Sequence, residues 1–324
     1  MGQTGSRAKS LAKTKKPKED KKADENDSSS SARRVVKLIE SVEEEEGLGA
    51  KVQRTIGCEE FDYLDPFLRL DEFDVLKPAG FPDHPHRGYE TVTYILKGCL
   101  DYEDFQGNKG SLQDGDLQWL TAGRGFVHTE MPSGEESCYG LQLWINLTSG
   151  DKMVEPSYQD IKKEDIPFES EGGARVRVIA GEALGKKSSV TTRTPTLFLD
   201  VELEEKASIS QVIPQGWNAF IYILSGKANV GPEKNVKEGT KHQILVLGDG
   251  ISVEASNKEA ELCHFLLIAG KPLNEPVERE GNFVMNTVEE VEEGIKDHRF
   301  GRNGFENAPD WNSQSALAYL DAQF

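Results

Sequence analysis

Apolar residues along most of this chain occur in short runs that alternate with polar residues or end at glycine-containing turns. Between residues 59 and 130 these runs are FDYLDPFLRL, TVTYILKG, CLDYEDF, LQWL and GFVH. Several short strands at this spacing predict an antiparallel β-sandwich or barrel. TVTYIL and YGLQLWINL are almost continuously apolar, which favours strands covered on both faces. Ahead of these strands, the pattern predicts a short helix over Arg34 to Glu46.

The strand pattern occurs twice. TYILKG at residues 93–98 returns as FIYILSG at 220–226, so that Tyr94 aligns with Tyr222 at an offset of 128 residues. DLQWLTAGRG has a weaker counterpart in HQILVLGDGI. A repeat of this length indicates two copies of one structural unit. We therefore predict two β-domains, joined near IKKEDIPFESEGG, whose charge and glycine content are those of a linker.

The pattern changes after residue 268. Thr287 and Glu290 have capping-box spacing, and Val288, Val291 and Ile295 follow as a narrow apolar stripe, which predicts a short helix packed against the barrels. The expected organisation is a disordered tail over 1–34, a first domain over 35–167, a second over 168–272, a C-terminal arm and helix over 273–311, and a flexible end over 312–324.

The N-terminal tail has almost no apolar residues, which predicts disorder. KTKKPKEDKK resembles a nuclear localisation patch, whereas Gly2 with Ser6 fits the myristoylation pattern, followed by basic residues that could supply a second membrane signal. A solvated tail without a receptor is the third interpretation. We expect a nuclear and cytoplasmic protein, with membrane association as the alternative if Gly2 is lipidated; mass spectrometry of Gly2 distinguishes the two.

Charge limits the classes of partner. Residues 1–22 carry a net charge of +6 within a total of −18, so the remainder carries −24. A body this acidic is unsuited to phosphate backbones, which argues against direct nucleic-acid binding and favours proteins or small molecules as partners. No apolar stretch is long enough to predict a membrane span. The four cysteines lack CxxC spacing and are expected to be reduced thiols.

Four residues form the candidate site. Residues two apart in a strand share a face, so FPDHPH places His84 and His86 together, and FVHTE does the same for His128 and Glu130. If the two segments are adjacent, three imidazoles and a carboxylate converge, a ligand set that suits Fe(II), Mn, Ni, Cu or Zn. The simpler interpretation is a hydrogen-bonded polar patch at a barrel mouth. Glu90, four residues beyond His86, is predicted to support the ligands from the same strand face.

The repeat offset offers a test of this site. His84 and His86 correspond to Val212 and Pro214 in the second copy, and with a two-residue gap His128 and Glu130 correspond to Glu254 and Ser256. The second domain thus keeps the strands without the ligands, which predicts one metal site per chain. The other histidines, at positions 242, 264 and 298, belong to no such pattern.

The motif HxHxxxE at His84, His86 and Glu90, with a later histidine, resembles the cupin superfamily, and more narrowly the pirin family. The matching stretches span roughly residues 35–310: FPDHPHRGYETVTYILKG, GDLQWLTAGRGFVHTEMP, GLQLWINL, EPSYQ, RTPTLFLD, IPQGWNAFIYILSG, HFLLIAGKPLNEPV and NFVMNT. The resemblance implies an all-β bicupin: two antiparallel β-sandwich or jelly-roll barrels with a short C-terminal helix. It also implies one iron, as Fe(II)/Fe(III), held in the first barrel by His84, His86, His128 and Glu130. The long basic tail and the C-terminal extension depart from the family pattern.

Two functions follow from the resemblance. The first is a redox-responsive transcriptional co-regulator, a monomer that binds transcription factors or other proteins through its acidic surface. The second is an iron-dependent quercetin 2,3-dioxygenase, which opens a flavonol with dioxygen and releases carbon monoxide, with Glu130 as a catalytic base. Both need the same four residues, and a purely structural metal is disfavoured because structural sites usually close their coordination sphere. An apolar cavity of several hundred cubic ångströms at the site would favour the dioxygenase, and a shallow site would favour the sensor.

Overall fold

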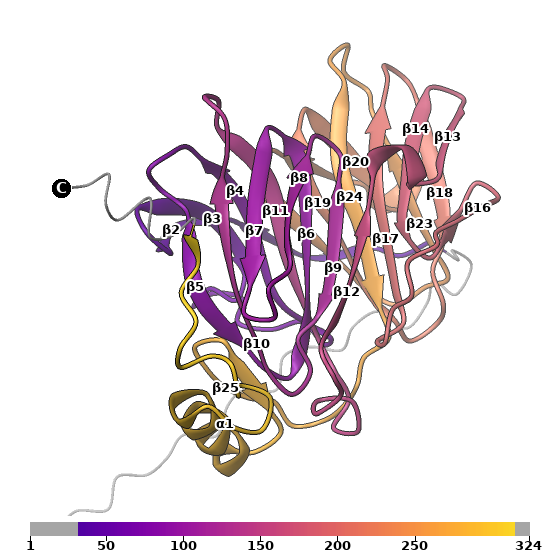
Figure 1. The fold of residues 1–324 in the computed structure, drawn as a ribbon. Helices are drawn as coiled ribbons and strands as arrows, with labels where there is room; N and C mark the ends of the chain where they lie inside the picture. Colours follow the sequence, from indigo (N-terminus) through magenta and orange to yellow (C-terminus); the bar gives the residue numbers. More distant parts are fainter. Residues whose placement is uncertain (1–31, 315–324) are drawn as a thin grey trace, which may run out of the picture. The chain divides into compact units, whose positions relative to one another are not determined.

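The computed structural model describes residues 32–314, and these residues fold mainly into β-strands (Figure 1). The helices are the α-helix α1 (Val288–Phe300) and the 3-10 turns η1 (Lys163–Asp165) and η2 (Glu233–Asn235). The strands are β1 (Val35–Glu40), β2 (Val42–Glu46), β3 (Ala50–Ile56), β4 (Phe67–Val75), β5 (Phe81–His86), β6 (Tyr89–Lys97), β7 (Cys99–Asp104), β8 (Lys109–Gln113), β9 (Leu117–Thr121), β10 (Phe126–Pro132), β11 (Cys138–Asn146), β12 (Ser157–Ile161), β13 (Phe168–Glu171), β14 (Ala174–Ala180), β15 (Glu182–Ala183), β16 (Lys186–Lys187), β17 (Thr196–Leu203), β18 (Ser208–Val212), β19 (Asn218–Ser225), β20 (Lys227–Val230), β21 (Lys237–Thr240), β22 (Gln243–Leu247), β23 (Ser252–Ser256), β24 (Cys263–Gly270), β25 (Glu278–Glu280) and β26 (Phe283–Met285).

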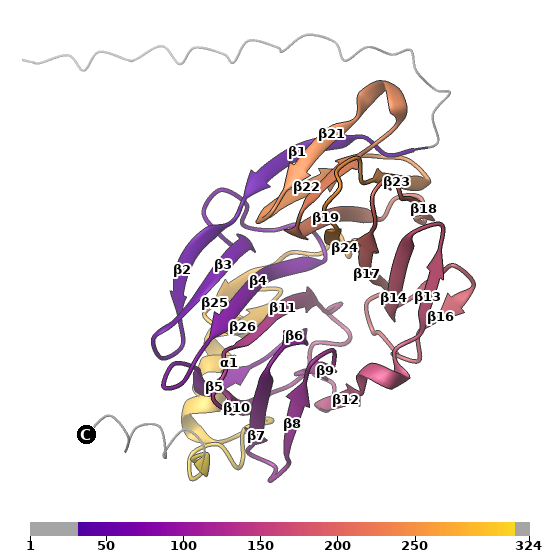
Figure 2. The same cartoon turned by 90° about the horizontal axis from the view of Figure 1, so that it is seen from above.

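The strands form two barrels of the same design. The first barrel combines a seven-stranded sheet, β12-β9-β6-β11-β4-β3-β2, with a four-stranded sheet, β5-β10-β7-β8. The second combines β1-β22-β19-β24-β17-β14-β13 with β18-β23-β20-β21. Figure 2 shows the first barrel in indigo and magenta beside the second in pink and orange. The predicted all-β, two-barrel cupin fold is therefore confirmed, including strands β6 and β11, which are buried on both faces.

The predicted helix over Arg34 to Glu46 is wrong, because these residues form strands β1 and β2. β1 pairs with β22 and is therefore an edge strand of the second barrel, although its residues were predicted to belong to the first domain. Its β-branched residues suit a strand that is buried at Ile39 and exposed at Val36. The pairing partner lies some 200 residues away, and a local pattern cannot reveal it.

The repeat found in the sequence is also present in the structure. β6 lies between β9 and β11, and β19 lies between β22 and β24, so the strands that carry Tyr94 and Tyr222 occupy equivalent places. The two seven-stranded sheets pack face to face through a shared apolar core. Within it, the Tyr94 hydroxyl donates to Asp200 at 2.6 Å and the Tyr222 hydroxyl donates to Glu72 at 2.6 Å. Asp200 and Glu72 are themselves 128 residues apart. Each repeat therefore anchors its tyrosine on the other repeat's carboxylate.

The second barrel has an apolar interior. Strands β18 and β23 alternate between buried and more exposed residues, and the buried residues belong to one hydrophobic cluster that includes Ile213, Val253 and Ala255. Of the positions that the repeat offset assigned to the ligands, Val212, Pro214 and Glu254 are exposed and Ser256 is half-buried. A constant offset between the two repeats does not account for the one-residue shifts that β-bulges introduce. Each such shift moves a side chain to the opposite face of the sheet. The interior neighbours of these positions carry no ligand groups.

The C-terminal helix matches its prediction. Thr287 caps α1, and the capping box with Glu290 is formed. The buried face of α1 consists of Val291, Gly294 and Asp297, whereas Val288 is exposed. At Gly294 a Cβ atom would lie 3.1 Å from Phe283 and 3.2 Å from the Arg87 side chain, so a larger residue would require these side chains to shift by a few tenths of an ångström.

Several predictions fall on other parts of the chain. The nuclear patch, the Gly2 modification and residues 1–31 of the predicted disordered tail lie outside the described part, as do residues 315–324 of the predicted flexible end. The tail prediction over 1–34 is wrong at its end, because Ala32 and Arg33 are buried and Arg33 donates to the carbonyls of Trp217 and Pro214. Ser313, at the start of the predicted flexible end, is buried, and its backbone N–H donates to Asp83. No helix within residues 32–314 is long and apolar enough to cross a membrane.

Candidate metal centre

Two adjacent antiparallel strands, β5 and β10, carry the predicted ligands. His128 lies directly opposite His84 in the pairing, and Phe126 lies opposite His86. The alternation of side chains sends His84 and His86 to the same face, as the sequence predicted. The ligating nitrogens of His84, His86 and His128 lie within 4.8 Å of one another. Two segments about 40 residues apart in sequence therefore meet at one point inside the first barrel.

The orientation of the imidazoles fits a metal. The Nδ1 atom of His84 lies 2.8 Å from the Pro82 carbonyl, which can only accept, so Nδ1 carries the proton and Nε2 keeps its lone pair. The Nδ1 atom of His86 is hydrogen-bonded to the Tyr89 hydroxyl. The Nε2 atoms of His86 and His128 lie 2.9 Å apart, the separation expected for nitrogens about 2.1 Å from a common ion at a right angle. The donor set and its convergence thus fit a bound metal ion.

Burial keeps these histidines neutral. Burial lowers the pKa of His84 to about 4, with a further contribution from His128, and lowers that of His128 to about 3. The pKa of His86 lies well below its usual value for the same reason. At neutral pH all three rings therefore present lone pairs, which is the form that binds metal.

Glu130 lies next to the histidines and is held by hydrogen bonds. Its Oε2 atom is 3.8 Å from the Nε2 atom of His128. Thr93 donates to Oε1 and Gln142 donates to Oε2, both at 2.9 Å, and the Trp144 indole donates to Gln142 at 3.0 Å. Burial raises the pKa of the Glu130 carboxyl. The carboxylate is thus aimed at the histidine cluster by polar residues that the sequence-based prediction did not include.

The predicted supporting role of Glu90 is wrong. Glu90 is buried, but its Oε1 atom accepts from Thr121, and no hydrogen bond joins it to a histidine of the cluster in the described part of the chain. The turn at Arg87 and Gly88, where Gly88 has a φ of +88°, separates β5 from β6, so strand alternation does not carry over from His86. Tyr89 and Thr93 face the cluster, and Glu90 faces the core between the barrels.

One signal in the sequence could have revealed the missed residues. Gln142 is a polar residue inside the apolar run GLQLWINL, and Trp144 lies two residues further on the same strand face. A buried amide needs a partner, so its position predicts a polar site beneath β11. Tyr89, Thr93 and Arg69 give no comparable signal, because their roles depend on which strands pair.

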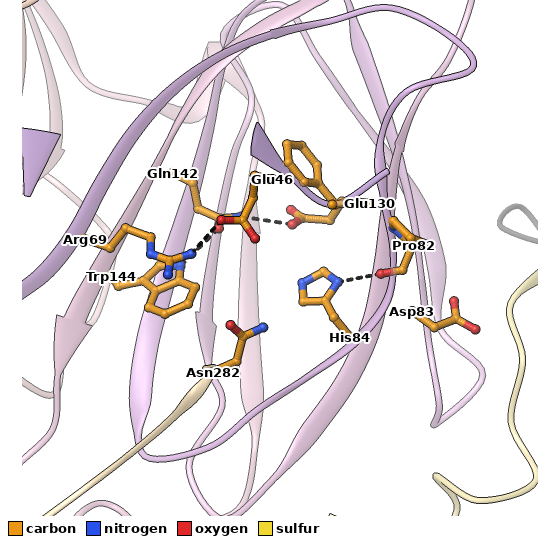
Figure 3. Close-up of a pocket in the computed structure, with 11 residues that line it drawn as sticks. Glu46, Arg69, Pro82, Asp83, His84, Glu130, Gln142, Trp144 and Asn282 are labelled. Atoms are coloured by element: carbon orange, nitrogen blue, oxygen red, sulfur yellow. Dashed lines mark hydrogen bonds and ion pairs between the residues drawn. The ribbon is translucent and has the colours of Figure 1, made fainter. Parts of the chain in front are cut away.

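A cavity of about 240 Å³ lies next to the histidines. Figure 3 shows His84, Pro82 and Asp83 on one side of it, Arg69 and Trp144 on the other, and Glu130 between them. Asn282, from the turn between β25 and β26, also lines it, so the C-terminal arm contributes to the wall. The lining mixes aromatic rings with charged groups, which suits a small polar aromatic ligand.

The fold and the site together define a class: a two-barrel cupin with a buried cluster of three histidines in the first barrel. Residues 49–145 match the family model described as Pirin, and residues 198–304 match the Pirin C-terminal cupin domain. The chain belongs to the pirin family.

Related proteins support this assignment. Human Pirin is 53% identical over 285 residues, covering 88% of this chain and 98% of the human protein. A Pirin-like protein of Solanum lycopersicum is 50% identical over 282 residues, covering 87% and 97% of the two chains. Among solved structures, a quercetin 2,3-dioxygenase from Acinetobacter baumannii is 32% identical with a TM-score of 0.77, covering 85% of this chain and 99% of that one.

A more distant structure shares the fold. The bacterial pirin YhhW of Escherichia coli, solved in complex with nickel(II), has a TM-score of 0.60 and 18% identity, covering 73% of this chain and 98% of that one. At this identity the likeness concerns the architecture alone.

Proposed function

We propose that this chain binds one iron ion through His84, His86, His128 and Glu130 and cleaves flavonols with dioxygen. The observation that carries the proposal is the cavity of about 240 Å³ that Glu130 and His84 both line. A redox sensor needs no such space, whereas a substrate does. The volume is slightly below the range of about 300–1,000 Å³ typical of small-molecule sites, which suits a compact planar ligand. The 32% identity to a solved quercetin 2,3-dioxygenase supports the same choice.

The residues around the cavity have distinct roles in this reaction. A bound iron would supply Lewis-acid polarisation and electron exchange with dioxygen. The Glu130 carboxylate, held by Thr93 and Gln142, accepts the proton of the flavonol 3-hydroxyl, which leaves an electron-rich ring. Phe81 and Trp144 contribute aromatic rings to the cavity lining, which reduces the water around a bound flavonol. Each flavonol then consumes one dioxygen and releases one carbon monoxide.

Metal analysis followed by oxygen-uptake measurements tests this proposal. Iron-loaded full-length protein is expected to consume dioxygen when quercetin is added under air and to release carbon monoxide in equal amount. Glu130→Gln keeps the size of the side chain and one of its two acceptor oxygens but cannot take up a proton, so uptake should fall by about 10²–10⁴-fold. Absence of turnover at full iron occupancy would exclude the reaction.

A second candidate, the redox-responsive transcriptional co-regulator, is favoured by the position of Glu46. This residue lines the cavity and also ends β2, an edge strand with exposed acidic side chains. A change of charge at the histidine cluster could therefore alter an exposed surface that a basic protein partner contacts. A titration of a Rel-type transcription factor with the Fe(II) and Fe(III) forms is expected to give different affinities. Equal affinities would remove the sensor role.

A further inference from the structure

The wall of the cavity opposite His84 contains a cation, Arg69. Arg69 lies on β4 directly opposite Trp144 on β11, and its guanidinium carbon is 3.9 Å from the centre of the indole ring. The other face of the indole stacks on Tyr89, with ring centres 4.5 Å apart. The guanidinium is thus fixed on a rigid aromatic support, and Figure 3 shows it beside the cavity.

Most N–H donors of the Arg69 guanidinium have no acceptor in the described part of the chain. Within residues 32–314, its one hydrogen bond runs from Nη1 to Glu46 at 3.2 Å, and its Nε atom is enclosed without a partner. The Arg69 side chain is 17% exposed, so water replaces few of the missing contacts. A guanidinium has five N–H donors, and buried donors are normally satisfied. The unused donors therefore indicate a ligand that accepts hydrogen bonds.

Glu46 only partly neutralises Arg69. The same Glu46 oxygen is 2.6 Å from Arg54, closer than it is to Arg69. Arg54 is held by Asp71 through two hydrogen bonds of 2.6 and 2.8 Å, and it also bonds Glu44. Glu46 is therefore shared between two arginines, and Asp71, which also attracts Arg69, is hydrogen-bonded to Arg54. Within residues 32–314, the shared Glu46 is the one carboxylate hydrogen-bonded to Arg69.

Apart from Glu46, the acidic groups that line the cavity are Asp83 and Glu130. Asp83 lies with His84 on the side away from Arg69, and Glu130 lies between the two sides (Figure 3). An anionic group is consequently disfavoured near Asp83 and favoured beside Arg69. This arrangement selects the orientation of a ligand as well as its charge.

We propose that Arg69 is a specificity-determining residue that binds an ionised oxygen substituent, a carboxylate or phenolate, of a planar aromatic ligand. The opposite end of the ligand, with its vicinal oxygens, lies at the histidine cluster; this orientation rests on the function proposed above. Arg69 hydrogen-bonds the anionic oxygen in the fork geometry typical of arginine.

A matched pair of ligands tests this subsite. Protocatechuate and methylcatechol share a catechol ring and differ by a carboxylate in place of a methyl group. Anaerobic calorimetric titrations of the full-length, iron-loaded protein are expected to show that Arg69→Met weakens protocatechuate binding by about 10-fold or more. Methylcatechol binding should change by less than about 2-fold, because the methionine retains the apolar cover over Trp144.

Two further variants and one control distinguish a role of Arg69 in ligand binding from a role in protein stability. Arg69→Lys keeps the charge but loses the planar fork, so it should recover part of the protocatechuate affinity. Glu46→Gln removes the competing carboxylate and should strengthen protocatechuate binding, the opposite of what a structural defect gives. Arg175→Met, in the second barrel where Arg175 pairs with Glu202, is the control and should leave both titrations unchanged.

The outcomes are distinguishable. Equal effects of Arg69→Met and Arg69→Lys on both probes, no effect on either probe, or no binding of either probe to the unmodified protein would overturn the subsite. Protocatechuate binding that depends on Arg69, together with no oxygen uptake from quercetin, would retain the subsite and exclude the dioxygenase.

Discussion

His128→Ala is expected to remove the bound metal and the activity that depends on it. His128 is 1% exposed, lies opposite His84 and has its Nε2 atom 2.9 Å from that of His86. Its replacement by alanine therefore removes one of the three imidazole nitrogens that converge on the site. Removing even a residue that supports a ligand typically costs about 10–100-fold in metal affinity, and removing a ligand should cost at least the upper value. Elemental analysis after dialysis should show one iron per unmodified chain and almost none in the variant.

Thermal unfolding provides a second measurement. A metal that binds the folded state raises the midpoint of unfolding, so a chelator should lower it for the unmodified protein and leave it unchanged for His128→Ala. His242→Asn is the control, because His242 lies outside the cluster and has a φ of +63°, which asparagine tolerates. Full iron occupancy in the His128→Ala protein would contradict the proposed ligand set.

Asp297→Ala is expected to cause the largest loss of stability among single changes outside the core. Asp297 on α1 accepts from Arg87 at 2.9 Å, and both side chains are 2% exposed. Burial opposes ionisation of Asp297, but hydrogen bonds from Arg87, Asn303 and Arg302 lower its pKa overall. Removing one partner of such a pair leaves a buried charge uncompensated, which costs about 3–5 kcal/mol. Urea unfolding measures this difference.

Position makes this pair important for the site as well as for stability. Arg87 directly follows His86, and its guanidinium also donates to the carbonyls of Arg124 and Asn303. Lys152 adds a parallel link, donating to the carbonyls of Gly88 and Val284. The variant should therefore also release metal faster than the unmodified protein.

An exposed pair on the same helix serves as the comparison. Glu292 and Lys296 lie 3.6 Å apart on the solvent face of α1, with side chains more than half exposed. Exposed pairs at this spacing contribute about 0.3–0.5 kcal/mol, so Glu292→Ala should change the free energy of unfolding little. A loss of stability of similar size in both variants would show that the buried pair adds nothing beyond a surface contact.

Much of the fold was predictable from local pattern. Alternating and continuous apolar runs identified β6, β7, β9 and β11, and the 128-residue repeat identified the second barrel. The capping box at Thr287 located α1. The segment that forms β1 and β2 was wrongly predicted as a helix, because β1 is fixed by pairing with β22 and β2 by pairing with β3.

The candidate site was predicted in part. His84, His86 and His128 share a face within continuous strands, where side-chain alternation is reliable, so the cluster could be predicted. Glu90 was misassigned because a turn interrupts the alternation between it and His86. Arg69, Tyr89 and Thr93 could not be found, since each reaches the cavity through a strand whose neighbours are set by long-range pairing.

The sequence by itself therefore determined the strand periodicity, the duplicated unit and the cluster of three histidines, and it predicted Glu130 beside them. Tertiary structure alone decided that each repeat's tyrosine bonds the other repeat's carboxylate, that Arg87 and Asp297 tie α1 to the strand bearing His86, and that Arg69 lies over Trp144 beside the cavity. The physical reason is that alternation within a strand depends on backbone geometry, which neighbouring residues specify. Contacts between strands and helices distant in sequence depend on how the whole chain packs.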